Sequence, residues 1–230
     1  MKDKVLVVIP TFNEEKNIER VVDNLIQNYP ELDYVVVSDG STDRTVQICE
    51  ERGYQIIKLP VNLGLAGCFQ TGMKYAWEKG YACAVQFDGD GQHRPEFISM
   101  MKKKMDEGYH IIIGSRFVDK KRDFSARMIG SRLLSGAIWL TTGRRIADPT
   151  SGMRMFDRSM IHEFAYNLNY GPEPDTVSFL LKQGAKVAEI PVRIDERTAG
   201  ESYLRPVVAI KYMLRMLASI LIIQNFRVRR

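Results

Sequence analysis

The sequence predicts an α/β fold, in which helices cover both faces of a mostly parallel β-sheet. Two observations lead to this prediction. Short runs of β-branched residues alternate with longer amphipathic stretches through the first half of the chain. The connections between them are short, as in βαβ units that form a parallel sheet buried on both faces.

The first half divides into five strands and four helices. Strands are expected at 4–10, 33–39, 54–60, 82–88 and 109–115. Helices are expected at 14–28, about 43–52, 65–80 and 95–108. Gly80 ends the third helix, and Pro95 stands in the first turn of the fourth.

The second half is less regular. A helix at 125–141 and a loop at 147–152 lead to a short strand near 153–156. Helices near 157–167 and 175–183, a strand at 185–194 and one long helix at 203–226 are expected to follow. No repeat, low-complexity tract or linker interrupts the chain. We therefore expect one domain over 1–205, followed by a C-terminal amphipathic helix within 206–230.

Composition is that of an ordinary globular protein, with 230 residues, 45% hydrophobic and 27% charged. The net charge of +5 suits an anionic partner such as a nucleotide, a phospholipid surface or nucleic acid, without distinguishing among them. A soluble surface with a few extra lysines explains the same charge. The three cysteines include no CxxC pair, which predicts small buried hydrophobic side chains in a reducing compartment. We expect neither a signal peptide nor a membrane-spanning helix.

Polar residues follow four of the expected strands, and these strand ends should lie along one edge of the sheet. Ligands bind beyond the carboxyl ends of strands in open parallel sheets. The four segments run from Pro10 to Glu14, from Ser38 to Asp43, from Asp88 to His93 and from Gly114 to Arg116.

Two acids, Asp88 and Asp90, flank a glycine directly after the fourth strand. Their carboxylates and the Gln92 amide oxygen would suit Mg²⁺ or Mn²⁺, and a cation would relieve the repulsion between the acids. A polar turn explains the same residues. An EF-hand is disfavoured, because Gln92 and His93 stand where that loop requires Asp or Asn and then Gly.

Asp39 ends the second strand, where a carboxylate can accept hydrogen bonds from a ribose or a base. The alternative is a helix start capped by Ser41 or Thr42. The glycines of 62–67 either admit a ligand closely or form a tight turn. No G-x-G-x-x-G follows the first strand, which disfavours a dehydrogenase-type dinucleotide site.

Hydrolase motifs are absent from the sequence. It contains neither G-x-S-x-G nor H-E-x-x-H, so nucleophilic hydrolase chemistry is poorly supported. The three histidines, His93, His110 and His162, are scattered and are expected to be structural or exposed on the surface.

Taken together, seven ordered motifs resemble those of family 2 glycosyltransferases with the GT-A fold, which has a Rossmann-like nucleotide-binding half. The most similar branch is that of the polyprenyl-phosphate glycosyltransferases, which includes dolichol-phosphate mannose synthase. The resemblance covers residues 4 to about 205. The motifs are Ile9–Glu14, Ser38–Asp43, Asn62–Gly64, Asp88–His93, Gly114–Arg116, Asp148–Gly152 and Glu196–Ser202.

The resemblance implies a role for each matching residue. The nucleotide would be bound by Pro10, Thr11, Phe12, Glu14, Asp39, Gly64 and Asp88. The metal, Mg²⁺ or Mn²⁺, would be held by Asp88, Asp90 and Gln92. The acceptor phosphate would meet Arg116, Arg127, Ser131, Arg197 and Ser202. The catalytic set would be Asp148, Asp90 and Arg116.

Asp148 matches the position often assigned as a base. A phosphate acceptor is already an anion that can attack the sugar carbon, so a base is hardly needed, and we expect Asp148 to orient the acceptor or an arginine. A single displacement would invert the anomeric centre.

The implied reaction moves a hexose from a nucleotide sugar, UDP-glucose or UDP-N-acetylglucosamine, to undecaprenyl phosphate for cell-surface polysaccharide modification. One alternative is a soluble transferase with a saccharide acceptor, which would need a true base. Another is a non-catalytic nucleotide-sugar-binding protein. The sequence departs from the family pattern at Ser38 (usually an acid), at Tyr203 (usually a lysine) and over 171–175 (usually apolar).

A polyprenyl acceptor requires contact with a bilayer. The segment 206–230 is apolar but interrupted by Lys211 and Arg215, which suits a helix lying on a membrane surface rather than spanning it. Arg227, Arg229 and Arg230 would meet anionic headgroups. The alternatives are a core-packing helix or an oligomer interface, and 125–141 is similarly ambiguous.

The expected location is cytoplasmic, peripheral on the inner face of the cell membrane. A small membrane partner protein or a homo-oligomer could supply additional anchoring. No nucleic-acid partner is expected.

Overall fold

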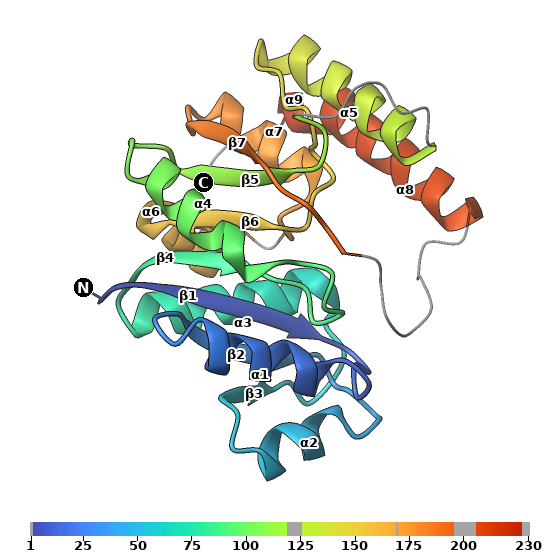
Figure 1. Ribbon diagram of the computed structural model, residues 1–230. Helices are drawn as coiled ribbons and strands as arrows, with labels where there is room; N and C mark the ends of the chain where they lie inside the picture. The colour runs from blue at the N-terminus through green and yellow to red at the C-terminus, as the bar shows by residue number, and fades with distance from the viewer. Residues whose placement is uncertain (1, 119–125, 169, 196–205, 227–230) are drawn as a thin grey trace.

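The computed structural model describes residues 2–118, 126–168, 170–195 and 206–226. Its centre is a seven-stranded sheet in the order β3-β2-β1-β4-β6-β5-β7 (Figure 1). The strands are β1 (Lys2–Thr11), β2 (Asp33–Ser38), β3 (Ile56–Lys58), β4 (Tyr81–Gln86), β5 (Ile111–Ser115), β6 (Arg154–Asp157) and β7 (Val187–Pro191). Only β6 runs antiparallel to its neighbours, so the described part of the chain confirms the predicted α/β class.

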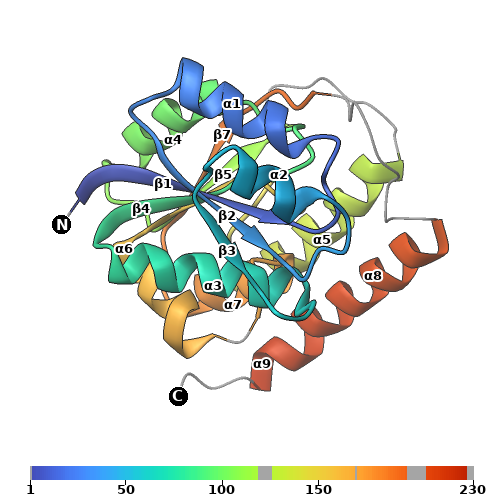
Figure 2. The same cartoon turned by 90° about the horizontal axis from the view of Figure 1, so that it is seen from below.

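Helices cover both faces of the sheet. Figure 2 shows α1 (Ile18–Asn28) and α4 (Ile98–Met105) on one side and α3 (Gly64–Glu78) and α7 (Pro174–Lys182) on the other. Beyond the second group, α5 (Ala126–Thr142) lies beside α8 (Pro206–Ala218) (Figure 1). The remaining helical segments are η1 (Pro95–Phe97), α2 (Thr45–Glu51), α6 (Arg158–His162), η2 (Glu163–Asn167), η3 (Ser219–Ile223) and α9 (Gln224–Phe226).

The two faces of the sheet carry two apolar cores. Successive strand residues alternate between them: Val8 packs with Phe69 and Phe156 in one core, and Val7 packs with Leu25 in the other. The three cysteines are unpaired and buried, as expected. Burial raises the pKa to about 11 for Cys49 and Cys83 and to about 12 for Cys68.

Several helices differ from the sequence-based expectation, among them the first and the last. The first begins at Ile18 rather than residue 14, because the Glu14 carbonyl accepts the amides of Asn17 and Ile18 in a preceding turn. The long C-terminal helix changes to a π-helix at Ser219–Ile223, where the Ser219 hydroxyl is held by Asp175. Its inner face packs into the core through the buried residues Met216 and Ile220.

The position of β6 determines what lies at the carboxyl edge of the sheet. The strand inserts between β4 and β5, pairing Arg154 with Gln86 and with Ile113. Because β6 is antiparallel to both, its amino end lies at the carboxyl ends of β4 and β5. The loop before β6 therefore joins the strand ends that the sequence had already placed at this edge. No helix of the described residues has the length and hydropathy that crossing a bilayer requires.

Candidate functional site

The loops after β1 and β2 are joined by hydrogen bonds. The side-chain oxygen of Asn13, a residue with φ of 57°, accepts the Thr42 amide at 2.8 Å. The Asn13 amide donates to the Ser41 hydroxyl at 3.2 Å. Ser41 and Thr42 are thus used between the loops and do not cap α2, which begins at Thr45 with no side-chain cap at Arg44. The two strand ends act as one structural unit.

The predicted nucleotide residues gather at these two ends. Asp39 is 5% exposed, and its Oδ1 accepts the Leu63 amide at 2.7 Å, which fixes the start of α3. Gly64 opens that helix with φ of 74°, a conformation that favours glycine. The Glu14 carboxylate accepts a hydrogen bond from the Asn17 amide group at 2.7 Å. Pro10, Thr11 and Phe12 follow along the end of β1.

Asp88 and Asp90 lie against the end of β1. A Cβ on the intervening Gly89 would stand 2.6 Å from the Thr11 methyl group, so only glycine allows this close approach. Asp90 is 6% exposed and accepts the Gln92 amide at 3.0 Å. The Asp88 side chain is 39% exposed and contacts Gln86 and His93. The second acid is therefore buried, while the first remains open to a ligand.

His93, which was expected to be structural or exposed, is buried and orients Asp88. Its Nδ1 accepts the Asp88 amide at 3.0 Å, and its Nε2 lies 3.5 Å from Asp88 Oδ2. An accepting Nδ1 places the proton of a neutral imidazole on Nε2, facing the carboxylate. The scattered sequence positions of the histidines gave no indication of this contact.

Gln92 makes its contacts with the segment after β7. Its side-chain nitrogen donates to the Asp195 carbonyl at 3.2 Å, and its carbonyl accepts the Asp195 amide at 3.0 Å. Arg94 donates to the Asp195 carboxylate at 2.6 and 2.8 Å and lowers the pKa of that carboxyl. These bonds attach residue 195 to the loop that carries the two acids.

The chemistry of this donor set fits a divalent metal ion. Two carboxylates offer the hard oxygen ligands that Mg²⁺ and Mn²⁺ prefer, and Mg²⁺ sites of this kind complete their coordination with water and phosphate oxygens. In the described ranges no group of three or more His, Cys, Asp or Glu side chains is arranged to hold an ion. The assignment of Asp88, Asp90 and Gln92 as metal ligands therefore stays a prediction.

Across the edge, Arg116 and Asp148 form an ion pair in which the carboxylate is buried and the guanidinium is partly buried. Arg116 Nε donates to Asp148 Oδ2 at 2.6 Å, and Nη2 donates to Oδ1 at 2.7 Å. The Arg116 amide adds a third bond at 3.0 Å. The Thr150 hydroxyl donates to Oδ1 at 3.0 Å, and the Asp148 side chain is fully buried.

Side chains of β7 and α5 hydrogen-bond to the backbone at Asp148 and the residue before it. Glu189 of β7 accepts the amides of Ala147 and Asp148 at 2.6 and 2.8 Å. The Ser131 hydroxyl, buried on α5, donates to the Ala147 carbonyl at 3.3 Å. Burial by itself would raise the pKa of Asp148, but the hydrogen bonds and positive charge of Arg116 outweigh it and lower that pKa. Asp148 is therefore a fixed anion at neutral pH.

The loop that carries Asp148 also contacts the first acid. A Cβ on Gly152 would stand 2.7 Å from Asp88 Oδ2, so the loop and the acid are in direct contact. The structure thus brings together the acids after β4, the ion pair beside β5 and the nucleotide residues after β1 and β2. Of the predicted acceptor residues, Arg197 and Ser202 lie outside the described residues, as does the Arg127 side chain.

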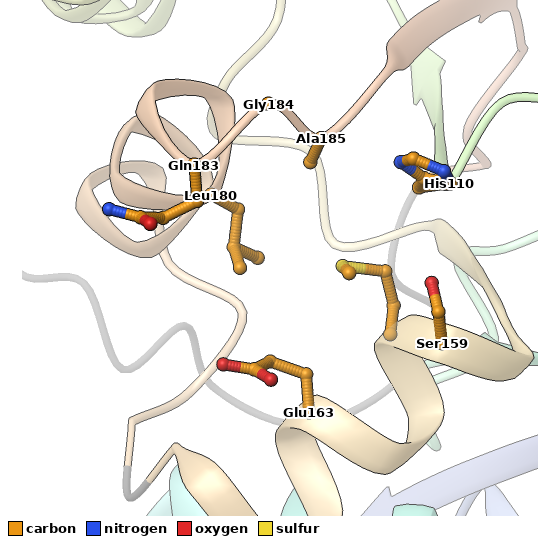
Figure 3. A pocket seen from close by; sticks show the side chains of 8 residues that line it. His110, Ser159, Glu163, Leu180, Gln183, Gly184 and Ala185 are labelled. Atoms are coloured by element: carbon orange, nitrogen blue, oxygen red, sulfur yellow. The ribbon is translucent and has the colours of Figure 1, made fainter. Parts of the chain in front are cut away.

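A separate pocket of about 220 Å³ lies at the opposite edge of the sheet, before β5 and β7 (Figure 3). Its lining includes His110, Ser159, Glu163, Leu180 and Gln183. Lys186 donates its amide to His110 Nδ1 at 3.1 Å, and Asn167 donates to the Glu163 carboxylate at 2.8 Å. These side chains have structural partners, and the pocket lies apart from the strand-end site.

Residues 6–164 match the family described as Glycosyl transferase family 2. The chain belongs to glycosyl transferase family 2. The resemblance inferred from the motifs is thereby confirmed. A relative from Methanococcus voltae, UDP-N-acetylglucosamine–dolichyl-phosphate N-acetylglucosaminyltransferase, is 31% identical over 84% of this chain and 86% of its own length. Polyprenol monophosphomannose synthase of Mycolicibacterium smegmatis is 27% identical over 86% of this chain and 80% of its own.

Solved structures show the same fold. Glucosyl-3-phosphoglycerate synthase of Mycobacterium tuberculosis, in complex with Mn²⁺, uridine diphosphate and phosphoglyceric acid, superimposes with a TM-score of 0.71 at 18% identity over 96% of this chain and 78% of its own. A mannosyltransferase of Pyrobaculum calidifontis in complex with GDP-mannose and Mn²⁺ gives 0.62 at 20% identity over 88% and 59%. This family 2 chain therefore has the predicted GT-A fold.

Proposed function

We propose that this family 2 chain transfers a hexose from a nucleotide sugar to the phosphate of a polyprenyl phosphate. The donor we propose is UDP-glucose or UDP-N-acetylglucosamine, and the acceptor is undecaprenyl phosphate or a related polyprenyl phosphate used for cell-surface polysaccharide modification. Relatives named for transfer to polyprenyl phosphates support the acceptor class.

The observation that carries this proposal is the state of Asp148. A saccharide hydroxyl must lose a proton to attack, so a saccharide acceptor needs a general base within reach of the hydroxyl. Asp148 is fully buried, and Arg116 and Thr150 occupy both of its oxygens. Its lowered pKa makes it a weak base. A phosphate acceptor needs no base, so this arrangement favours the phosphate over the saccharide alternative.

Each side chain of the site would have a separate role in the reaction. Asp88, Asp90 and the Gln92 amide oxygen would hold Mg²⁺ or Mn²⁺, which would neutralise the charge of the departing nucleoside diphosphate. His93 keeps the Asp88 carboxylate turned toward the edge of the sheet. Arg116, held by Asp148, would present positive charge to the acceptor phosphate in a site where charged hydrogen bonds are strong.

The nucleotide would lie over the joined loops after β1 and β2. Asp39 is buried, and one of its oxygens holds the Leu63 amide. A carboxylate has two oxygens and several lone pairs, so the second oxygen can accept from a ribose hydroxyl. The Ser38 departure from the family pattern leaves this acid in place. Arg127, Ser131, Arg197 and Ser202 remain proposed acceptor residues on the resemblance alone.

A surface for the lipid lies on the paired helices α5 and α8. Large apolar side chains are exposed there, namely Ile129, Leu133, Trp139 and Leu140 on α5 and Ile210, Leu214, Leu221, Ile222, Ile223 and Phe226 on α8, η3 and α9. Exposed cations on the same segments are Arg132, Lys211 and Arg215. Apolar and basic residues together suit the interface of an anionic bilayer. We propose that the protein is peripheral on the inner face of the membrane.

The test is a transfer assay. Purified protein with Mn²⁺ or Mg²⁺ would be offered labelled UDP- and GDP-sugars with undecaprenyl or dolichyl phosphate in vesicles. Label extracted into organic solvent for one sugar, and lost on adding EDTA, is the expected result. Transfer of label to soluble oligosaccharides instead would overturn the acceptor assignment, and nucleotide-sugar binding without any transfer would favour the non-catalytic alternative.

A further inference from the structure

Arg154 is an arginine inside the apolar run at the start of β6. It is 2% exposed, and Nη2 donates to the Pro149 carbonyl at 2.5 Å. Its Nε and Nη1 have no hydrogen-bond partner among the described residues, and neither does Oε1 of Gln86, its partner across the strand pair. Burying a guanidinium with unsatisfied donors lowers the stability of the fold, which suggests that Arg154 has a role other than stabilising the core.

The charge of Arg154 stands among the acids of the site. Burial lowers the pKa of its guanidinium, and the charge of Glu173 is the largest opposing influence, followed by Tyr212, Asp148 and Asp88. The ordinary pKa of arginine is far above neutrality, so the group stays charged. One buried cation is therefore shared electrostatically by acids on both sides of the strand-end site.

Glu173 connects this cation to α8. The Tyr212 hydroxyl, on α8, donates to Glu173 Oε2. Two residues later, Asp175 Oδ2 accepts the Ser219 hydroxyl at 2.6 Å and the Gln224 amide at 3.3 Å. Both acids lie in the 171–175 stretch that departs from the family pattern. Their structural role is to tie the C-terminal helices to the loop before α7.

We propose that Arg154 and Glu173 are positioning residues that couple α8 to the Arg116–Asp148 pair. Pro149 directly follows Asp148, so holding its carbonyl fixes the backbone from which that carboxylate projects. Hydrogen bonds join Tyr212 to Glu173 and Arg154 to the Pro149 carbonyl. The attraction between the charges of Glu173 and Arg154 connects these two pairs, from a helix with exposed apolar side chains to the loop that carries the ion pair. The structural coupling is independent of the proposed function, and only its effect on catalysis rests on that function.

The test compares two tyrosines. Tyr212→Phe removes the hydroxyl that binds Glu173 and keeps the ring. Tyr54→Phe is the matched control, because Tyr54 donates to Asp23 at 2.5 Å on the far face of the sheet. Hydrogen exchange of the amides over 147–152 is the readout that does not depend on activity. We expect Tyr212→Phe to speed their exchange about fivefold, the effect of one lost hydrogen bond, and Tyr54→Phe to leave it unchanged.

Kinetics then test the catalytic consequence. We expect Tyr212→Phe to lower kcat for lipid transfer by a similar factor, with the KM for the nucleotide sugar unchanged. Glu173→Gln should do the same, and the double variant should be no worse than Glu173→Gln alone. The coupling would be overturned if the amides over 147–152 exchanged at the same rate in both tyrosine variants. It would also be overturned if the effects of Tyr212→Phe and Glu173→Gln on kcat were additive in the double variant. A wild-type protein that transfers nothing would overturn the proposed function, and the exchange comparison would still decide the coupling.

Discussion

The carboxylate of Asp148 and the guanidinium of Arg116 lie 32 residues apart in sequence and meet at 2.6 and 2.7 Å beside the carboxyl end of β5. The pair fixes an anion and a cation in one orientation at the edge of the sheet. Removing Arg116 would leave a buried carboxylate without its counter-charge, and removing Asp148 would leave a partly buried guanidinium without its counter-charge.

Asp148→Ala is expected to lower the free energy of unfolding by about 3–5 kcal/mol, the usual cost of breaking a buried ion pair. The matched control is Lys102→Ala, which breaks an exposed pair with Asp106 and should cost about 0–1 kcal/mol. Urea unfolding at pH 7 measures both. Equal losses in the two variants would show that the Asp148 pair is no stronger than a surface pair.

The stability provided by Asp148 should depend on pH in a defined direction. Its folded-state pKa lies below the ordinary value, so the folded state binds fewer protons than the unfolded state. The stabilisation is complete above the unfolded pKa of about 3.9 and is lost as the pH falls through the folded pKa. Asp148→Asn, compared with wild type from pH 7 to pH 3, should show a difference that narrows only below about pH 4. A difference independent of pH would contradict this.

Asp90→Ala is expected to abolish metal-dependent turnover without unfolding the protein. Loss of one carboxylate from a two-acid site should weaken Mn²⁺ binding on the order of 100-fold, because metal coordination contributes several kcal/mol. Calorimetric titration with Mn²⁺ plus UDP measures binding independently of transfer. Asp106→Asn, an exposed acid on the far end of α4, is the control. Full activity of Asp90→Ala would refute the metal assignment.

Gly152→Ala tests the contact between the Asp148 loop and Asp88. The new methyl group would stand 2.7 Å from Asp88 Oδ2 and must displace that side chain. We expect weaker Mn²⁺ binding with little loss of stability, since only the end of a side chain moves. Gly136→Ala is the control, because its Cβ meets open space on α5, and it should raise stability by about 0.5–1 kcal/mol. Unchanged Mn²⁺ affinity in Gly152→Ala would argue against Asp88 as a ligand.

The proposed membrane surface predicts which substitutions weaken vesicle binding. Leu140 on α5 is 73% exposed, and Ile222 on η3 is 60% exposed. Replacing either with Glu should weaken binding to anionic vesicles about tenfold, since burying such a side chain is worth about 1.5 kcal/mol or more. Ile26→Glu, at an exposed position on α1, should have no effect. Vesicle sedimentation measures all three, and equal binding would remove this surface from consideration.

The sequence by itself determined the α/β class, the order of the elements through β5 and the four strand ends that form the site. The class and the order of the elements can be read from the sequence, because hydrophobic periodicity and the positions of turn-forming residues depend only on residues close together in the chain. Asp39, Asp88, Asp90 and Arg116 could be selected for the same reason, since each stands directly at a strand end.

Only the tertiary structure decided how these residues are used. In the folded chain, β6 lies antiparallel between β4 and β5, and the Gln92 amide group donates to Asp195. His93 contacts Asp88, and Arg116 binds Asp148. The tertiary structure also buried Arg154 of β6, which no sequence motif had marked. These outcomes depend on contacts between residues far apart in the chain, whose energies arise from burial and pairing and leave no local pattern in the sequence.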